Sequence, residues 1–329
     1  MKKILSLVLV LVMLIAVLAG CKKEENAGGA EKLPNFMAMS GPTGVGAAKL
    51  LAEQEAAAEG SKVVASATVV ADNEAITSAL INGEADIAAI ATNMAATLYQ
   101  KLDGDLQVLA VNTMGVLYIL EKGETVSSMA DLRGKTVYAT GKGANPEYIL
   151  AHLLTSNGVD PSEVDIQWMT PQEVTAAMAT GEAGICMLPV PAATALMIKD
   201  SGVREAISLS AEWDKLGYGA LAQGCIVARR SYVEENPQAV AAFLAAYEAS
   251  LNFVKDPANR SEAAELVAQY GITANAAIAA KAIPQCNLTY VTGLEMREML
   301  QAFYDVMHKA NPASIGGAMP GDDFYYGLG

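Results

Sequence analysis

The sequence has 329 residues, 52% of them hydrophobic, and a formal net charge of −14. A net-acidic chain with no basic cluster in its body is not expected to bind nucleic acid. The body beyond the N-terminal segment, roughly 300 residues, exceeds what one simple core usually holds, so we expect two lobes.

The N-terminus is typical of a secretory signal. Lysines at positions 2 and 3 precede an uncharged apolar run over residues 4–19, which is shorter than the roughly 20 residues that span a bilayer. A charged start and a short apolar run predict a signal peptide over residues 1–20 rather than a membrane helix. The run ends in Leu-Ala-Gly-Cys, which resembles the bacterial lipoprotein box.

This resemblance implies cleavage before Cys21 and a lipid on its sulfur. A chance cysteine after an ordinary signal peptide is the alternative. The charged and small residues at 21–32 predict a flexible tether between the lipid and the folded body.

Cys186, Cys225 and Cys286 lie in apolar stretches and lack the spacing of metal ligands. We interpret them as buried small hydrophobic side chains, with a disulfide between two of them as the alternative. No metal site and no cofactor are expected, because His and Cys ligands are not clustered.

Residues 76–98 and 174–196 form an internal repeat in which eight of 23 aligned positions are identical. Each copy predicts an amphipathic helix, a turn at Asn-Gly or Thr-Gly, and a short apolar strand. A polar loop is expected over residues 91–94 in the first copy, and a proline-containing loop over residues 188–191 in the second. Coincidence in an alanine-rich sequence is the alternative.

A glycine-rich turn between a strand-like and a helix-like run precedes each copy, at residues 40–46 and 140–146. Two α/β units of this kind predict mostly parallel sheets with helices on both faces. Ligands bind such sheets beyond the carboxyl ends of the strands. The turns of the two units would therefore face each other across a cleft.

On these motifs, residues 33–329 resemble the solute-binding proteins of the nitrate/sulfonate/taurine and thiamine-precursor group, the NMT1/THI5-like family. The matching motifs are Ser-Gly-Pro-Thr-Gly at 40–44, Gly-Glu-Ala-Asp-Ile at 83–87, Asp-Leu-Arg-Gly-Lys-Thr-Val at 131–137 and Tyr-Val-Glu-Glu-Asn-Pro at 232–237.

The resemblance implies an α/β chain with a type II periplasmic-binding-protein fold, in which two α/β lobes are joined by two hinge crossovers. Lobe one would comprise residues 33–115 and 222–329, and lobe two residues 120–217. The chain would cross near residues 115–118 and return near residues 223–226.

The implied function is that of the extracytoplasmic solute-binding subunit of an ABC importer. It would capture a sulfonate, nitrate or a thiamine-precursor-like molecule by hinge closure. Its partners would be this small-molecule ligand and permease subunits with a cytoplasmic ATPase. The protein would lie on the outer face of the cell membrane and contact the membrane through its lipid anchor only.

The first glycine-rich turn is the main candidate for ligand contact in lobe one. Ser40, Gly41, Pro42, Thr43 and Gly44 would present backbone N–H groups at a helix N-terminus, where the helix dipole favours an anion. The turn lacks the Gly-Lys-Ser/Thr ending of a P-loop. A tight turn that only needs glycine dihedral angles is the alternative.

In lobe two the candidates are Gly141, Lys142, Gly143 and Asn145. Lys142 is the only basic side chain in either glycine-rich turn, so it is the candidate for a cationic contact, with a solvated surface lysine as the alternative. Asn145 can both cap the helix that starts at Pro146 and contact the ligand.

Further candidates lie at strand ends and beside the crossovers. Thr92 and Asn93 would line the cleft from lobe one, while Pro189 would form a rigid apolar wall in lobe two. Thr113 and Gln223 lie next to the predicted crossovers.

The sequence does not indicate catalysis. His152 lies in an apolar helix-like run and His308 near a helix end, so we interpret both as structural. One branch of the resembled family contains pyrimidine-forming enzymes of thiamine synthesis, but the cysteine-rich, iron-associated motif of that branch is absent. We therefore predict a non-enzyme; a surface sensor of the same fold or a pyrimidine-synthase-like enzyme is the alternative. Trp168 and Trp213 are expected in the core.

Overall fold

The computed structural model describes residues 31–71 and 73–328. The expected signal peptide, Cys21 and residues 22–30 of the expected tether lie outside the described residues. The chain divides into two compact units, Met1–Lys32 and Leu33–Gly329, and the second is described below. Within the described part of the chain, every helix is too short or too polar to cross a membrane.

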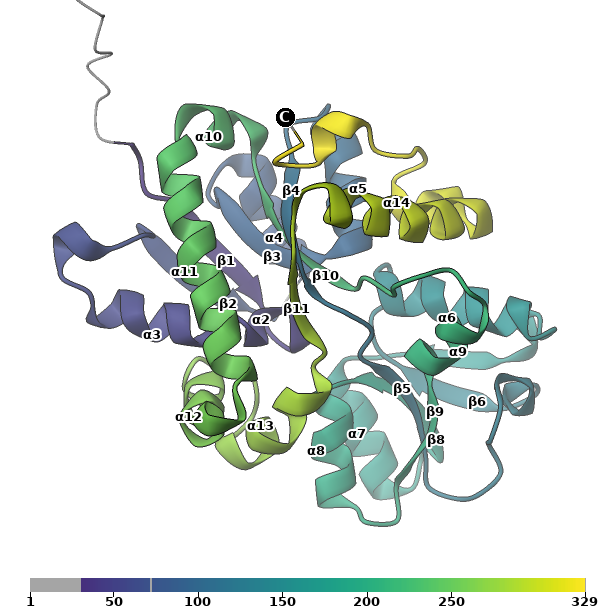
Figure 1. The fold of residues 1–329 in the computed structure, drawn as a ribbon. Coiled ribbons are helices and arrows are strands. Elements are labelled where there is room, and N and C mark those ends of the chain that lie inside the picture. The colour runs from purple at the N-terminus through teal and green to yellow at the C-terminus, as the bar shows by residue number, and fades with distance from the viewer. Residues whose placement is uncertain (1–30, 72, 329) are drawn as a thin grey trace, which may run out of the picture. The chain divides into compact units, whose positions relative to one another are not determined.

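The first sheet of this unit has six strands in the order β11-β4-β10-β3-β1-β2 (Figure 1). β1 is parallel to β2 and β3, whereas β10 is antiparallel to β3 and β4. The strands are β1 Asn35–Met39, β2 Ser66–Val70, β3 Ile87–Ala91, β4 Gln107–Thr113, β10 Gly224–Ala228 and β11 Leu288–Val291.

The second sheet has five strands in the order β7-β6-β8-β5-β9. β6 is parallel to β7 and β8, and β5 is antiparallel to β8 and β9. The strands are β5 Leu117–Glu121, β6 Thr136–Ala139, β7 Asp165–Trp168, β8 Ile185–Pro189 and β9 Arg204–Ser208.

Helices cover both faces of each sheet. The helices are α2 Pro42–Val45, α3 Ala48–Ala56, α4 Asn73–Asn82, α5 Thr92–Lys101, α6 Asn145–Ser156, α7 Pro171–Thr180, α8 Ala192–Lys199, α9 Leu209–Lys215, α10 Arg230–Glu235, α11 Pro237–Lys255, α12 Arg260–Gln269, α13 Ala276–Ala282 and α14 Gly293–Ala310.

Three buried apolar clusters hold these layers together. The first joins α4, α5 and α14 on the first sheet to α6 and α9 on the second, and it contains Trp213. The second packs α3, α11, α12 and α13 on the other face of the first sheet. The third packs α7 and α8 on the remaining face of the second sheet. Because all three lie within residues 33–329, this unit contains its own hydrophobic core, as an independently folding body requires.

The structure confirms the internal repeat. α7 and β8 begin 98 residues after α4 and β3, and the lengths of the paired elements are equal. Each helix is followed by a left-handed glycine, Gly83 at φ 73° and Gly181 at φ 78°, a conformation that glycine adopts without steric cost. The polar loop predicted over residues 91–94 was wrong, because α5 begins at Thr92 directly after β3 ends at Ala91.

The chain passes between the two sheets twice, at residues 114–116 and at residues 216–223. The first crossing is packed so closely that a Cβ on Gly115 would lie 2.0 Å from Ser210 Oγ. The exact bounds of the two lobes stay a prediction; β5 already begins at Leu117, before the expected start at residue 120.

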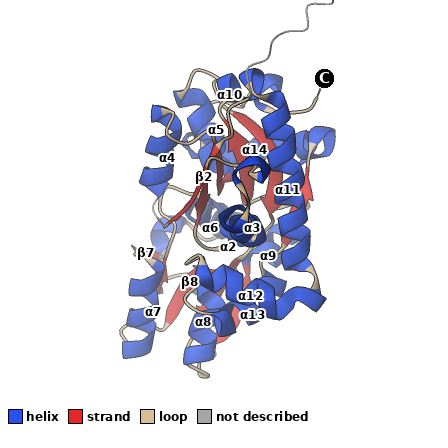
Figure 2. Cartoon of the chain, turned by 90° about the vertical axis from the view of Figure 1, so that its left-hand side faces the viewer, coloured by secondary structure: helices blue, strands red, loops and turns tan. Residues whose placement is uncertain are grey.

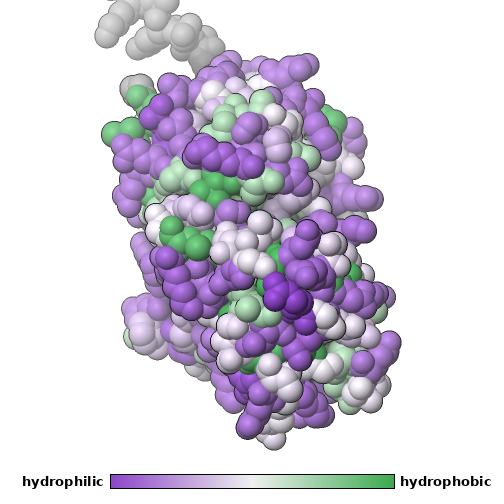
Figure 3. All heavy atoms as spheres, turned by 90° about the vertical axis from the view of Figure 1, so that its right-hand side faces the viewer, coloured by the Kyte–Doolittle hydropathy of each residue, from purple (hydrophilic) through white to green (hydrophobic). Residues whose placement is uncertain are grey.

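The C-terminal segment after α14 is fastened to the first sheet and its helices. The backbone N–H of Tyr326 donates to Val108 O at 3.0 Å, and Arg297 pairs with Asp322 at 2.7 Å. Hydrophilic residues predominate on the face shown in Figure 3, where hydrophobic residues occur in small groups.

Glu121, at the end of β5, is a buried carboxylate. It accepts hydrogen bonds from the N–H groups of Thr125 and Val126 at 2.9 and 3.1 Å and pairs with Arg204 at 2.6 Å. Burial raises the pKa of Glu121, but the hydrogen bonds and the Arg204 charge outweigh it, so the pKa lies below its ordinary value. The ionised form therefore stabilises the fold above the unfolded-state pKa, and this stabilisation is lost as the pH falls through the lowered pKa.

We predict that Glu121→Gln lowers the free energy of unfolding at pH 7 by about 1–3 kcal/mol, because the substitution weakens the hydrogen bonds of buried donors. The difference from the parent protein should shrink between about pH 5 and pH 3, as the parent carboxyl becomes protonated. Urea unfolding measures both effects, and Glu124→Gln at the exposed neighbouring carboxylate is the control. A difference that stays constant down to about pH 3 would contradict the prediction.

Candidate functional site

A cavity of about 430 Å³ lies between the helices of the two sheets, close to the carboxyl ends of β1 and β8. In Figure 2, α8, one of the two helices of the second sheet that border the cavity, lies next to α13 of the first sheet. The lining residues are Ser40, Gly41, Pro42, Pro171, Gln172, Thr175, Ala176, Pro189, Pro191, Ala192, Ala195, Lys199, Ile272, Thr273, Ala274 and Ile278. Within this set the only charged side chain is that of Lys199, so the cavity combines apolar walls with a single cation.

The turn after β1 supplies one wall. Ser40 N–H donates to Val70 O at 2.7 Å, and Gly41 has φ 89°, a left-handed conformation that favours glycine. At Gly44 a Cβ would lie 2.2 Å from Met39 O, so the return of the chain at this point requires glycine. These constraints place the start of α2, at Pro42, beside the cavity.

The opposite wall comes from the starts of α7 and α8. α8 has no side-chain cap at Pro191, and Ala192, its first residue, lines the cavity. Uncapped N–H groups and the helix dipole make such a terminus electropositive. The start of α7 at Pro171 also lines the cavity, but Thr170 and Glu173 already cap that helix.

Four of the predicted site residues line this cavity: Ser40, Gly41, Pro42 and Pro189. Thr43 and Gly44 lie just behind the turn, where Thr43 O accepts a hydrogen bond from Asn112 Nδ2 at 3.0 Å.

Thr92, Asn93, Asn145 and Gln223 lie together at a direct contact between the two lobes. Asn145 Nδ2 donates to Thr92 Oγ1 and to Gln223 O, both at 2.9 Å. Asn93 Nδ2 donates to Ser314 O at 3.2 Å. The expectation that Asn145 caps α6 was wrong: the helix includes Asn145, its N-cap is Ala144, and the amide points into lobe one instead.

The remaining predicted residues line none of the cavities described here. Lys142 is exposed. Gly141, at φ 90°, packs against Pro146, which a Cβ would approach to 2.5 Å, and Gly143 N–H donates to Glu147 Oε2. Thr113 Oγ1 donates to Asn112 Oδ1 at 3.0 Å. Ligand contact by these residues stays a prediction.

Sequence reasoning missed Gln172, Thr175, Thr273 and Lys199. The Thr-Pro start of α7 is a helix-start signal and, together with the repeat, could have indicated the first two. Thr273 follows α12, far along the chain, and only the folded structure brings it to the cavity.

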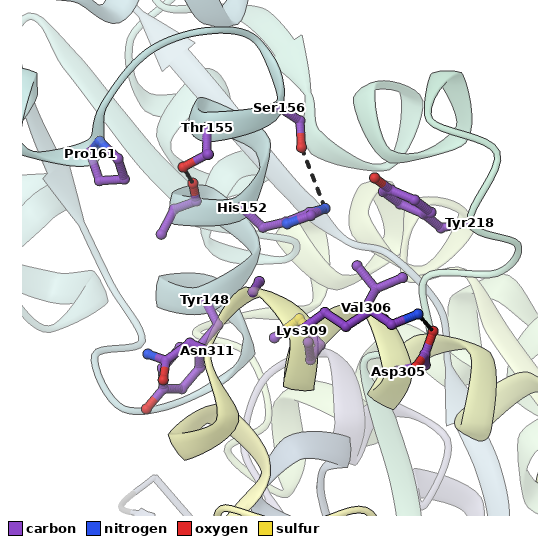
Figure 4. A pocket seen from close by; sticks show the side chains of 13 residues that line it. Tyr148, His152, Thr155, Ser156, Pro161, Tyr218, Asp305, Val306, Lys309 and Asn311 are labelled. Carbon is purple, nitrogen blue, oxygen red and sulfur yellow. Dashed lines mark hydrogen bonds and ion pairs between the residues drawn. The ribbon is translucent and has the colours of Figure 1, made fainter.

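A second cavity, of about 630 Å³, lies between α6 and α14 (Figure 4). His152 packs against Trp213 and Tyr218 with ring centroids 5.6 and 5.4 Å apart, and burial lowers the pKa of His152. His152 Nε2 lies 3.5 Å from Ser156 Oγ, one turn along the same helix, which is long for a hydrogen bond.

Comparison with known proteins agrees with the fold. Residues 106–261 match the model of the family described as NMT1/THI5 like. The matched region contains two of the motifs on which the sequence resembles this family, at 131–137 and 232–237. No curated protein gives a significant match to the sequence.

Solved structures resemble this chain over most of its length. An ABC transporter protein from Parabacteroides distasonis is 23% identical, covers 91% of this chain and 100% of its own, and superposes with a TM-score of 0.73. The periplasmic aliphatic sulphonate-binding protein SsuA from Escherichia coli is 20% identical, with coverages of 85% and 93% and a TM-score of 0.69.

The periplasmic nitrate-binding protein NrtA from Synechocystis PCC 6803 is 15% identical, with coverages of 73% and 66% and a TM-score of 0.55. These likenesses confirm the predicted fold of two α/β lobes of a periplasmic binding protein.

The thiols of residues 33–329 are buried in the core. Cys186, Cys225 and Cys286 are free and buried, as the sequence predicted. Burial raises the pKa of Cys186 and of Cys286 to about 12 and raises that of Cys225 as well. A thiol that is neither ionised nor accessible does not act as a nucleophile.

We predict that the folded unit, residues 33–329, does not react with a thiol reagent such as dithiobis(nitrobenzoate), because all its thiols are buried and protonated. Unfolding in guanidinium should release the three thiols at once, and absorbance measures both states. Rapid labelling of any thiol in the folded protein would contradict this.

Proposed function

We propose that this protein is the extracytoplasmic solute-binding subunit of an ABC importer, held at the outer face of the membrane by a lipid on Cys21. The observation that carries this proposal is the cavity between the lobes, which both lobes line at the carboxyl ends of their parallel strands. Its shared fold with periplasmic binding proteins, one of which binds aliphatic sulphonates, supports the same role. The permease subunits and their ATPase are the proposed partners.

The chemistry of the cavity favours an anionic head group. Lys199 at its rim has no ion-pair partner among the described residues, and the uncapped start of α8 faces the cavity. None of the lining residues is acidic. Each of these positive groups favours a negative charge, and they lie at opposite ends of α8, about 10 Å apart along the helix.

The size and walls of the cavity favour an organic ligand over a bare inorganic ion. A volume of about 430 Å³ lies in the range of sites for small organic molecules. Pro42, Pro189 and Ile278 supply apolar surface, and nitrate has no apolar group to pack against it. We therefore infer a small organic anion, such as an alkanesulfonate, as the ligand class.

Capture would follow from closure of the lobes. Since the cavity draws its walls from both lobes, a bound ligand contacts both only when they are together. It therefore shifts the population towards the closed arrangement. The closed form is the one expected to dock on the permease.

We predict that a short-chain alkanesulfonate raises the melting temperature of residues 33–329, because a ligand at 100 times its dissociation constant adds about 2.7 kcal/mol of stability. The panel for thermal unfolding contains alkanesulfonates, nitrate, carboxylates and thiamine-pathway pyrimidines. Saturable stabilisation by one anionic class supports the proposal. Stabilisation by the pyrimidines alone would contradict the anionic assignment.

We predict that Ala195→Trp abolishes this stabilisation, because the indole ring occupies the space beside α8 that the ligand needs. Ile198→Trp is the matched control, since Ile198 lies on the same helix, is 43% exposed and does not line the cavity. Both variants are compared in the thermal assay with the ligand that stabilises the parent protein. Unchanged stabilisation of folded Ala195→Trp would place the ligand elsewhere.

A further inference from the structure

Beside the apolar cluster that joins α14 to α6 and α9, the two lobes touch through a small set of polar groups, here called the amide seam. It consists of Thr92, Asn93 and Gln223 from lobe one, and of Asn145 and the Gly143 carbonyl, which accepts from Asn93 Nδ2 at 3.5 Å, from lobe two. Thr92, Asn93, Asn145 and Gln223 are each at least 93% buried. The seam joins the start of α5 to the start of α6, at the facing ends of β3 and β6.

Asn145 is the centre of the amide seam. Both hydrogens of its amide are used, one on Thr92 Oγ1 and one on Gln223 O, at 2.9 Å each. Thr92 Oγ1 in turn donates to Ala222 O at 2.7 Å, so its hydrogen points away and its lone pairs face Asn145. Thr92 and Gln223 are therefore oriented to receive this donor from lobe two.

Neighbouring groups in lobe one fix these acceptors. Tyr304 Oη donates to Thr92 O at 2.8 Å, and Gln223 Oε1 accepts from Val116 N–H at 2.6 Å. Val116 belongs to the first crossing between the sheets. The acceptors that Asn145 reaches are thus tied to the segment about which the lobes would turn.

The amide seam is also incompletely satisfied. The Oδ1 atoms of Asn93 and Asn145 are buried and have no hydrogen-bond partner in the structure. A buried acceptor without a partner is destabilising, whereas water would satisfy it if the lobes parted. The two hydrogen bonds from Asn145 favour the closed arrangement of the lobes, and the two unpartnered oxygens favour the open one. The equilibrium between closed and open lobes is therefore sensitive to the Asn145 side chain.

We propose that Asn145 is a latch residue that holds the two lobes together through protein–protein hydrogen bonds. It sets ligand affinity through the equilibrium between open and closed forms rather than by touching the ligand. The opening motion belongs to the proposed function, but the latch does not depend on which ligand binds. Two further direct bonds between the lobes, Asn93 Nδ2 to Gly143 O at 3.5 Å and Thr194 Oγ1 to Gln285 Oε1 at 3.0 Å, would remain in an Asn145 variant.

The test measures the separation of the lobes without any ligand. The protein used comprises residues 33–329 and carries a spin label at each of two introduced cysteines. These are Glu124→Cys in lobe two and Glu234→Cys in lobe one, both at exposed positions. The native thiols are buried and stay unlabelled. Pulsed electron–electron resonance then gives the distribution of distances between the labels. In the parent protein we expect one short-distance population.

Asn145→Ala should lower the ratio of closed to open molecules about tenfold or more, because two buried hydrogen bonds are lost. A longer-distance population should appear. Asn145→Asp, which keeps the shape but sets a carboxylate against Gln223 O, should increase that population further. Asn157→Ala is the matched control, because Asn157 ends the same helix and bonds only within it, to Leu153 O at 2.8 Å.

A parent-like distance distribution in Asn145→Ala and Asn145→Asp, with thermal unfolding showing both folded, would overturn the proposal. An equal change in Asn157→Ala would also overturn it, since the effect would then come from α6 itself. This experiment uses no ligand, so it can be interpreted even if no compound of the thermal-unfolding panel binds. Conversely, if the distance between the lobes does not change in the variants, the proposed ligand class is unaffected.

Discussion

The two passages of the chain between its sheets, residues 114–116 and 216–223, are the constraint on which the other features depend. Within residues 31–71 and 73–328 they are the only covalent connections between the lobes, so the other contacts that join the lobes there are packing contacts and hydrogen bonds. Both passages run beside strands of the first sheet, and the side chain of Gln223 holds them together through Val116. Lobe position is therefore decided by non-covalent surfaces around one narrow, well-packed joint.

Parallel strands then determine where the site lies. In both sheets the strands that carry the repeat, β3 and β8, end at the edge facing the other lobe, and a helix starts there immediately or after two residues. Helix N-termini therefore gather between the lobes, where unpaired N–H groups favour anions. The cavity between the lobes has a single lysine and no carboxylate in its walls, in a chain whose net charge is −14.

The same geometry also separates two tasks. On one side of the joint the facing ends of the lobes leave a cavity lined by proline, alanine and hydroxyl side chains. At the amide seam the two lobes meet directly, and the side-chain amide of Asn145 donates both of its hydrogens to lobe one. Residues at the strand ends that face the other lobe thus divide between lining the cavity and joining the lobes.

The sequence predicted most of the fold but only part of the site. The spacing of the Gly-Glu-Ala turns located the repeat, because a left-handed glycine after an amphipathic helix is a local requirement. The first glycine-rich turn and Pro189 were located by the same logic. Asn145 was misinterpreted as a cap, since its partners Thr92 and Gln223 are distant in sequence and only lobe packing brings them within reach. The position of Lys199 at the cavity could not be predicted from the sequence, because nothing local distinguishes it from an ordinary basic residue in the last turn of a helix.

The central claim is that a small organic anion binds between Ser40–Pro42 of lobe one and Pro189–Ala192 of lobe two. A crystal structure of residues 33–329 grown with the alkanesulfonate that stabilises them most would test it directly. The account predicts ligand density in that cavity, with its anionic group towards the start of α8. Density in the cavity between α6 and α14, with the inter-lobe cavity holding only water, would contradict it.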